Sequence, residues 1–170
     1  AYDVQKLGMI DDYDDEYLDV SAENIKVYEM DSGADVTDKF NVSVEDGVAY
    51  AFAKHVDRVN SNGEEVKGEQ PKSLAEYRTK TLDPVEDPII DQSLLGKKYY
   101  VVIDGKVKKD TDGYVIKNQA IQNINNAEYA TRIVSNPIKQ INPDKDIVVD
   151  EASKDKSCLL YTSDAADDSL

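Results

Sequence analysis

Few side chains in this sequence are of the types that commonly carry out catalysis. His55 is the single histidine and Cys158 the single cysteine, so no disulfide and no zinc site of paired ligands is expected. Acyl transfer needs three convergent groups, and the sequence has no Gly-x-Ser-x-Gly motif. It also has no Gly-rich phosphate loop. We therefore interpret His55 as a packing or surface residue and predict that the chain is not an enzyme.

Carboxylates are plentiful, and they suggest one cofactor. Calcium takes roughly six to eight oxygen ligands from carboxylates and carbonyls. The best candidate ligands are Asp11, Asp12 and Asp14. Asp110 and Asp112 form a poorer candidate, because no bidentate Glu follows at the spacing of an EF-hand. The alternative for both clusters is a solvated acidic turn without a metal.

The charge balance excludes one class of partner. The chain has 170 residues, the length of about one domain, and its 35 acids against 20 bases give a formal net charge of −15. Such a surface repels phosphate backbones, so we expect no nucleic-acid binding. No apolar run reaches the length of about 18 residues that a membrane-spanning helix needs, so we expect no direct membrane insertion.

Short apolar segments between turn residues predict strands at 25–30, 40–44, 98–103, 114–124 and 127–136. Asp104-Gly105 is expected to be a hairpin turn. Residues 48–58 fit a helix or a strand, 60–72 an exposed insertion loop, and 73–78 a short helix. The pattern favours an all-β, antiparallel β-sandwich with one or two short helices in long connections.

The C-terminal segment has a different character. CLLYTSDAADD, residues 158–168, resembles an in-frame translation of a sequencing-library adapter. The resemblance implies that 158–170 is a non-native tail, and we expect it to take no part in the fold. The alternative is a genuine apolar strand at Leu159, Leu160 and Tyr161, followed by an acidic tail.

Two blocks resemble the C-terminal stalk domains of the antigen I/II family of Gram-positive surface adhesins. The first is QKLGMIDDYDDEYLDV, residues 5–20. The second is NQAIQNINNAEYATRIVSNPIKQINPDKDIVV, residues 118–149. The resemblance implies an adhesin stalk domain over 1–149, truncated at its N-terminus, and the start of a linker to the next module at 150–157.

The resemblance also implies a fold and a reaction. Family members fold as immunoglobulin-like sandwiches, so the first strands are expected before Ala1. Many carry an intramolecular isopeptide bond between a Lys on an early strand and an Asn on the last, promoted by a buried Asp. The Asn matches Asn136 in VSNPI, and the Lys and Asp are expected upstream of Ala1. The alternative for Asn136 is a pre-proline strand-end residue that bonds to backbone.

These features predict a structural and adhesive module of an extracellular, cell-wall-anchored adhesin. Its partners would be a host or bacterial surface protein or glycan, and the neighbouring domains of the same chain. The alternative is a carbohydrate-binding or other ligand-binding β-sandwich of a secreted protein. That alternative predicts a face of clustered exposed Tyr, and the absence of Trp counts against sugar stacking.

Overall fold

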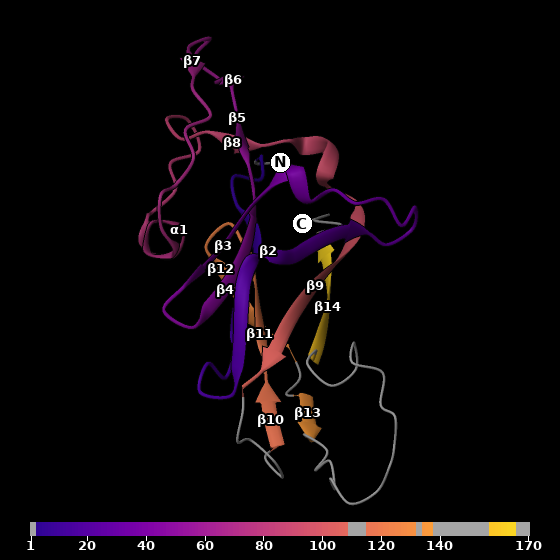
Figure 1. Cartoon of the computed structure of the whole chain (residues 1–170). Coiled ribbons are helices and arrows are strands. Elements are labelled where there is room, and N and C mark those ends of the chain that lie inside the picture. The colour runs from indigo at the N-terminus through magenta and orange to yellow at the C-terminus, as the bar shows by residue number, and fades with distance from the viewer. Residues whose placement is uncertain (1–2, 109–114, 132–133, 138–156, 166–170) are drawn as a thin grey trace, which may run out of the picture.

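The computed structural model describes residues 3–108, 115–131, 134–137 and 157–165, and most of them lie in strands (Figure 1). The longer strands are β1 (Leu7–Asp12), β2 (Leu18–Glu29), β3 (Phe40–Glu45), β4 (Val48–Ala53), β9 (Lys97–Val107), β10 (Val115–Asn118), β11 (Ala120–Ile124), β12 (Ala127–Ala130), β13 (Val134–Pro137) and β14 (Ser157–Ala165). The two-residue strands are β5 (His55–Val56), β6 (Arg58–Val59), β7 (Glu65–Val66) and β8 (Ile89–Ile90). The helical elements are α1 (Leu74–Thr79) and the 3-10 turns η1 (Thr37–Lys39) and η2 (Gln92–Leu94).

Two antiparallel sheets form the body of the domain. The larger has the strand order β12-β11-β1-β4-β3, and the smaller has the order β14-β9-β2. A two-stranded sheet of β10 and β13 lies at one end. The expected fold class, an all-β antiparallel sandwich, is confirmed.

The main core lies between the two sheets. Alternate residues of β1 and β4, such as Met9 and Ala51, pack in one hydrophobic cluster with Val27 of β2 and Val101 of β9. Every second residue of β9 is buried from Tyr99 to Gly105, as the period of two along a strand requires. The core therefore fixes the register of β9 against β2.

β1 and β4 are buried on both faces. Their second faces hold Ile10, Tyr50 and Phe52, which pack under Tyr77 of α1. Phe52 stacks on Tyr77 with ring centroids 4.1 Å apart. Gly8 faces Phe52 in the register, and a Cβ at Gly8 would overlap the Phe52 ring. Burial on both faces explains why residues 48–58 show no strand alternation, although 48–53 form a strand.

β9 is longer than the sequence predicted. Asp104 and Gly105 are not a hairpin turn, because β9 continues to Val107 and Gly105 pairs with Val20 of β2. The register of β2 shifts between Val20 and Ile25, where it meets the same part of β9. Gly105 is thus a strand residue beside an irregular stretch, a common place for glycine in sheets.

Two of the expected strands each divide between sheets. Residues 114–124 contain β10 and β11, and 127–136 contain β12 and β13. β11 and β12 belong to the five-stranded sheet, whereas β10 pairs with β13 in the small one. The chain therefore crosses twice between the five-stranded sheet and the two-stranded sheet of β10 and β13.

Residues 54–90 form an excursion at the other end of the domain. The expected helix is confirmed as α1, which begins after Ser73, whose hydroxyl accepts a hydrogen bond from the backbone N–H of Glu76. Residues 60–72 are not all loop, because β7 pairs with β6. Arg78 of α1 forms a two-pronged ion pair with Glu128 of β12, at 2.9 and 2.8 Å. No helix in the described ranges is long and apolar enough to cross a membrane.

The C-terminal segment does take part in the fold. Ser157–Ala165 forms β14, which runs antiparallel to β9 over nine consecutive residue pairs. The expectation that residues from Cys158 onward contribute nothing to the fold is therefore wrong. The alternative strand at Leu159, Leu160 and Tyr161 is what the structure shows. The physical reason is that β9 presents an edge whose backbone groups a tail can pair with.

Candidate functional site

Asn136, the expected isopeptide acceptor, lies on β13. The register pairs Asn136 with Ile116 and Val134 with Asn118 on β10. Ile116 is buried among the core residues. β13 is the last described strand of the family-like region and ends at Pro137, as the sequence indicated. The cross-link itself stays a prediction.

A buried polar pair lies next to this strand. The Asn118 side-chain amide donates to the Asp11 carboxylate, with an Nδ2–Oδ2 distance of 3.1 Å. Asp11 is 1% exposed and Asn118 is 3% exposed. Asp11 pairs with Ala120 of β11, so the pair joins β1 to β10. Sequence reasoning missed Asn118, since no local pattern distinguishes it from other Asn residues.

The candidate calcium ligands do not point to one place. Asp11 is buried, while its neighbour Asp12 is exposed, as the alternation of a strand requires. The Asp14 carbonyl accepts hydrogen bonds from the N–H groups of Tyr17 and Leu18. Within the described ranges, no group of three or more His, Cys, Asp or Glu could hold a metal ion. Asp110 and Asp112 lie outside the described residues, and calcium binding stays a prediction.

A cavity of about 600 Å³ lies within the excursion at 54–90, with Lys6 among its lining residues. Lys6 is 4% exposed, its ammonium donates to the carbonyl of Tyr77, and burial lowers its pKa. His55 also lines the cavity, with Nδ1 2.7 Å from the Glu69 carbonyl and Nε2 3.1 Å from the Gln5 carbonyl. The lining mixes acids and lysines, and Lys6 and His55 are both engaged with the backbone.

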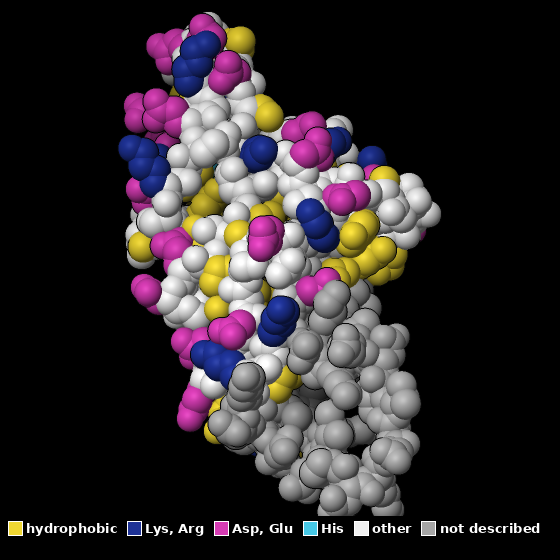
Figure 2. All heavy atoms as spheres, in the orientation of Figure 1, with side chains coloured by type: hydrophobic (Ala, Val, Ile, Leu, Met, Phe, Trp, Pro, Cys, Tyr) yellow, Lys and Arg dark blue, Asp and Glu magenta, His cyan; other side chains and the backbone are white. Residues whose placement is uncertain are grey.

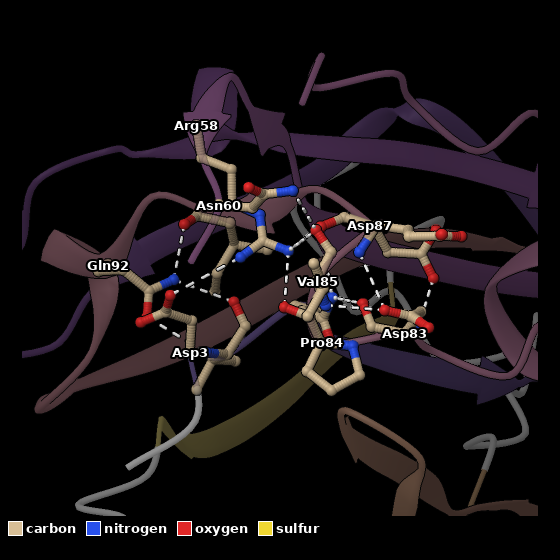
Figure 3. A network of polar contacts seen from close by, with 12 residues as sticks. Asp3, Arg58, Asn60, Asp83, Pro84, Val85, Asp87 and Gln92 are labelled. Carbon is tan, nitrogen blue, oxygen red and sulfur yellow. Dashed lines mark hydrogen bonds and ion pairs between the residues drawn. The ribbon is translucent and has the colours of Figure 1, made fainter. Parts of the chain in front are cut away.

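Arg58 organises the base of the excursion (Figure 3). Its side chain is 8% exposed and lies 4.0 Å from the Asp3 carboxylate. Its Nη2 donates to the carbonyls of Pro84, Val85 and Asp87 at 2.8, 3.0 and 2.5 Å. One guanidinium thus fixes a loop, β6 and the N-terminal segment, a task suited to the several donors of arginine.

The face shown in Figure 2 carries described side chains of both charges. On the face in Figure 2, Asp and Glu side chains extend from end to end, with Lys and Arg between them. Tyr28 of β2 and Tyr100 of β9 stack with centroids 5.1 Å apart, and both are half-buried. Tyr129 of β12 is 59% exposed, but it lies on the other sheet. The described tyrosines therefore form a stacked pair rather than the wide exposed face that a sugar-binding sandwich predicts.

Comparison with known protein families identifies one family for this chain. A family model described as the cell surface antigen I/II C2 terminal domain matches residues 1–138. The match ends one residue after β13 and includes Asp11, Asn118 and Asn136. No curated protein matches the chain. The chain belongs to the antigen I/II C2 terminal domain family and is a module of a surface adhesin.

Proposed function

We propose that this domain is a stalk module of a cell-wall-anchored adhesin, holding the adhesive parts of the protein away from the cell. The observation that carries the proposal is the placement of its two ends. The N-terminus lies beside β5 and β8, and the Ile90 N–H bonds to the Val4 carbonyl there (Figure 1). β13, the last strand of the matched region, lies with β10 at the opposite end. Within the matched region the first and last described segments thus lie at opposite ends, an arrangement that adds length when such domains follow in series.

The strand order also suits a domain under tension. β1 is the first long strand, and it is the central strand of the five-stranded sheet, between β11 and β4. Its backbone hydrogen bonds run perpendicular to the strand. Force along β1 therefore loads both ladders together, over the five residue pairs on each side. Such a strand resists extraction better than an edge strand that opens one pair at a time.

Small-angle scattering on the parent adhesin tests the stalk geometry. We expect the maximum dimension to fall by about the long axis of this domain when residues 1–138 are deleted. The matched control is Lys67→Met, an exposed position on the excursion, which leaves both ends in place and should leave the length unchanged. A parent whose maximum dimension is the same with and without 1–138 would rule out a stalk role.

Asn136 supplies the proposed covalent support in the intact parent. A lysine upstream of Ala1 would attack the side-chain carbonyl carbon of Asn136, forming an amide as ammonia leaves. The buried carboxyl that promotes this step was expected upstream as well. The described chain offers another, Asp11, because its partner Asn118 pairs in register with Val134, two residues before Asn136 on β13. The burial of Asp11 supports this role.

Intact-mass measurement tests the cross-link. Loss of ammonia makes the parent domain lighter than its sequence by about 17 Da. We expect Asn136→Ala to restore the full mass and Asp11→Ala to slow the loss. The 170-residue chain should have its full sequence mass, because the expected donor is not part of it. A parent of full mass, or a deficit that survives Asn136→Ala, would remove Asn136 from this role.

Calcium at Asp11, Asp12 and Asp14 is a separate proposal, supported by the acidic sequence of this segment alone, since Asp11 is buried and Asp12 is exposed. A ligand that binds only the folded state stabilises it by about 2.7 kcal/mol at a hundred times its dissociation constant. We expect millimolar calcium to raise the melting temperature of the chelated chain, and Asp12→Asn to remove the rise. An unchanged melting temperature would end the proposal.

A further inference from the structure

The entry segment, residues 3–6, leads into β1 and is held along its length before the strand begins at Leu7. Val4, Gln5 and Lys6 are all buried. Every backbone N–H and C=O of these three residues lies within hydrogen-bonding distance of a partner. The partners come from three places outside β1: the excursion at 54–90, η2, and the turn between β11 and β12.

Gln92 of η2 takes the place of a neighbouring strand beside Val4. Its Oε1 accepts from the N–H of Val4 at 3.2 Å, and its Nε2 donates to the carbonyl of Val4 at 2.9 Å. The N–H of Ile90 donates to the same carbonyl at 3.2 Å. A primary amide has a donor and an acceptor, as a peptide unit has, so Gln92 pairs with Val4 as a strand residue would.

Asn125 continues the pairing of β11 with β1 beyond its last regular pair, Leu7 with Ile124. Its Oδ1 accepts from the N–H groups of Gln5 and Lys6 at 2.8 and 3.2 Å, and its own N–H donates to the Lys6 carbonyl at 2.8 Å. Asn125 has a φ of 51°, in the left-handed region that asparagine tolerates better than most residues. The turn thus presents both the side chain and the backbone of Asn125 to the entry segment.

The loop at 83–87 holds the side chain of Gln5. Its amide nitrogen donates to the carbonyls of Asp83 and Asp87 at 2.7 and 3.4 Å. Arg58 fixes the same loop from β6 and also approaches the Asp3 carboxylate (Figure 3). The loop that Arg58 organises is therefore also the loop that receives the entry segment.

Two further contacts come from distant parts of the excursion. His55 of β5, 50 residues away, places its Nε2 at 3.1 Å from the Gln5 carbonyl. Tyr77 of α1, 71 residues away, accepts from the ammonium of Lys6 through its backbone carbonyl. The excursion thus contacts the entry segment from β5, β6, α1 and the loop at 83–87.

We propose that Gln92, Asn125 and the excursion form a mechanical clamp on the entry segment, which must open before tension at the N-terminal end reaches the ladders of β1. The contacts are spread over consecutive residues of an extended segment, and backbone hydrogen bonds of such a segment run across its direction. A pull along the segment therefore loads them together. The proposal rests on the proposed stalk function and names the part of the module that bears the load first.

The unfolding rate under constant tension tests the clamp. The full chain carries Cys158→Ser, with anchors at Asp3→Cys and Pro137→Cys. Gln92→Met removes the amide at similar side-chain length, and Asn125→Gly removes the side chain while a residue that accepts a positive φ stays in place. We expect the chain with both substitutions to unfold at least about tenfold faster, because several buried hydrogen bonds are lost.

Two matched substitutions serve as controls. Gln119→Met removes an exposed amide that donates to the Thr131 carbonyl, away from the entry segment. Asn126→Gly alters the exposed neighbour of Asn125 in the same turn. Together they should leave the unfolding rate under tension nearly unchanged. An acceleration as large as that of Gln92→Met with Asn125→Gly would overturn the clamp.

A second pulling direction separates a clamp from a general loss of stability. Anchors at Asp38→Cys and Pro137→Cys apply tension at η1, so that it does not enter through the entry segment. Gln92→Met with Asn125→Gly should then change the unfolding rate much less than in the first geometry. An equal acceleration in both geometries would show that these contacts stabilise the fold without bearing the load, and would overturn the proposal.

The single variants keep the proposal testable if the double variant does not fold. Gln92→Met and Asn125→Gly each remove one part of the clamp, and each should speed unfolding several-fold with the Asp3 anchor. A chain that resists tension in this geometry, but whose unfolding rate neither substitution alters, would overturn the clamp and leave the stalk proposal standing. Low resistance in the chain without these substitutions would instead contradict the stalk proposal.

Discussion

The side-chain amide of Asn118 donates to the carboxylate of Asp11 over 3.1 Å, across 107 residues of sequence. Asp11 lies on the central strand of the larger sheet, and Asn118 ends the strand that pairs with β13. This buried contact joins β1 to the two-stranded sheet of β10 and β13. A force applied to β13 is therefore transmitted to β1 partly through the contact at Asp11.

Asp11→Ala is expected to destabilise the domain. The substitution removes the acceptor of a buried amide, which costs about 1–3 kcal/mol. Urea unfolding should show this loss, and hydrogen exchange should show faster opening of β10. Asp19→Ala is the matched control, because Asp19 is 72% exposed and its ion pair with Lys108 spans 3.8 Å. The control should cost below about 0.5 kcal/mol. Equal stability losses in Asp11→Ala and Asp19→Ala would show that the buried contact with Asn118 does not stabilise the domain more than an exposed ion pair does.

Gly8→Ala is expected to disturb the second hydrophobic cluster. A Cβ at Gly8 would overlap the Phe52 ring, which is fully buried and stacked on Tyr77. Overpacking of this kind costs about 1–3 kcal/mol. Phe52→Leu removes the ring, so Gly8→Ala should cost less in that background, as a double-mutant cycle measures. Additive effects of the two substitutions would contradict the close packing of Gly8 and Phe52.

Arg58→Lys is expected to loosen the loop at 83–87. Arg58 contacts the three carbonyls of the loop through Nη2 and lies beside Asp3 through Nη1, and a single lysine ammonium cannot keep both sets of contacts. We expect a stability loss of about 1–3 kcal/mol, because part of these largely buried contacts loses its donor. Limited proteolysis should cleave the loop faster. Lys67→Met removes only exposed ion pairs with Asp57 and Glu65 and should leave the rate unchanged. Unchanged cleavage in Arg58→Lys would be the contrary result.

Stability should fall at alkaline pH because of Tyr99. Burial, with the nearby charges of Glu29 and Asp91, raises the pKa of Tyr99 to about 12. An unfolded tyrosine titrates near pH 10, so above about pH 10 the unfolded state has released a proton that the folded state retains. The free energy of unfolding is therefore unaffected by this group below about pH 10 and falls between about pH 10 and 12.

Tyr99→Phe checks the assignment. It removes the hydroxyl that donates to the Leu94 carbonyl at 2.7 Å, so it lowers stability at neutral pH but flattens the decline at high pH. Burial also raises the pKa of Tyr50 to about 12. Tyr50 should therefore still contribute to the loss of stability at high pH in the Tyr99→Phe variant. Tyr129→Phe, at an exposed position, should leave the slope as it is. An unaltered slope in Tyr99→Phe would show that another group is responsible.

The sequence predicted the elements with one buried face and missed those with two. Phe40–Val44 alternates clearly and is β3, the edge strand of the larger sheet. Residues 48–53 lie in the middle of that sheet and are apolar throughout, so periodicity could not distinguish a strand from a helix. Asp104-Gly105 was interpreted as a turn from composition, although the pairing with β2 keeps it extended.

The candidate site was predictable only in part, for a similar reason. The family resemblance placed Asn136 on the last strand, and β13 has that position. The contact between Asp11 and Asn118 depends on β1 lying beside β11, a pairing between distant segments that local patterns do not encode. The sequence therefore groups Asp11 with its neighbours as a candidate metal ligand. In the strand, Asp11 and Asp12 point to opposite faces, and only Asp11 is buried.

Single-molecule force spectroscopy tests the stalk proposal most directly. The full chain carries Cys158→Ser, and anchors are attached through Asp3→Cys and Pro137→Cys, so that tension enters at β1 and β13. The comparison attaches anchors through Asp38→Cys and Lys54→Cys, at the open end of the β3–β4 hairpin, where pairs separate one at a time. The account predicts a rupture force several-fold higher in the first geometry, because both ladders of β1 are loaded together. Equal or lower force in the first geometry would contradict it.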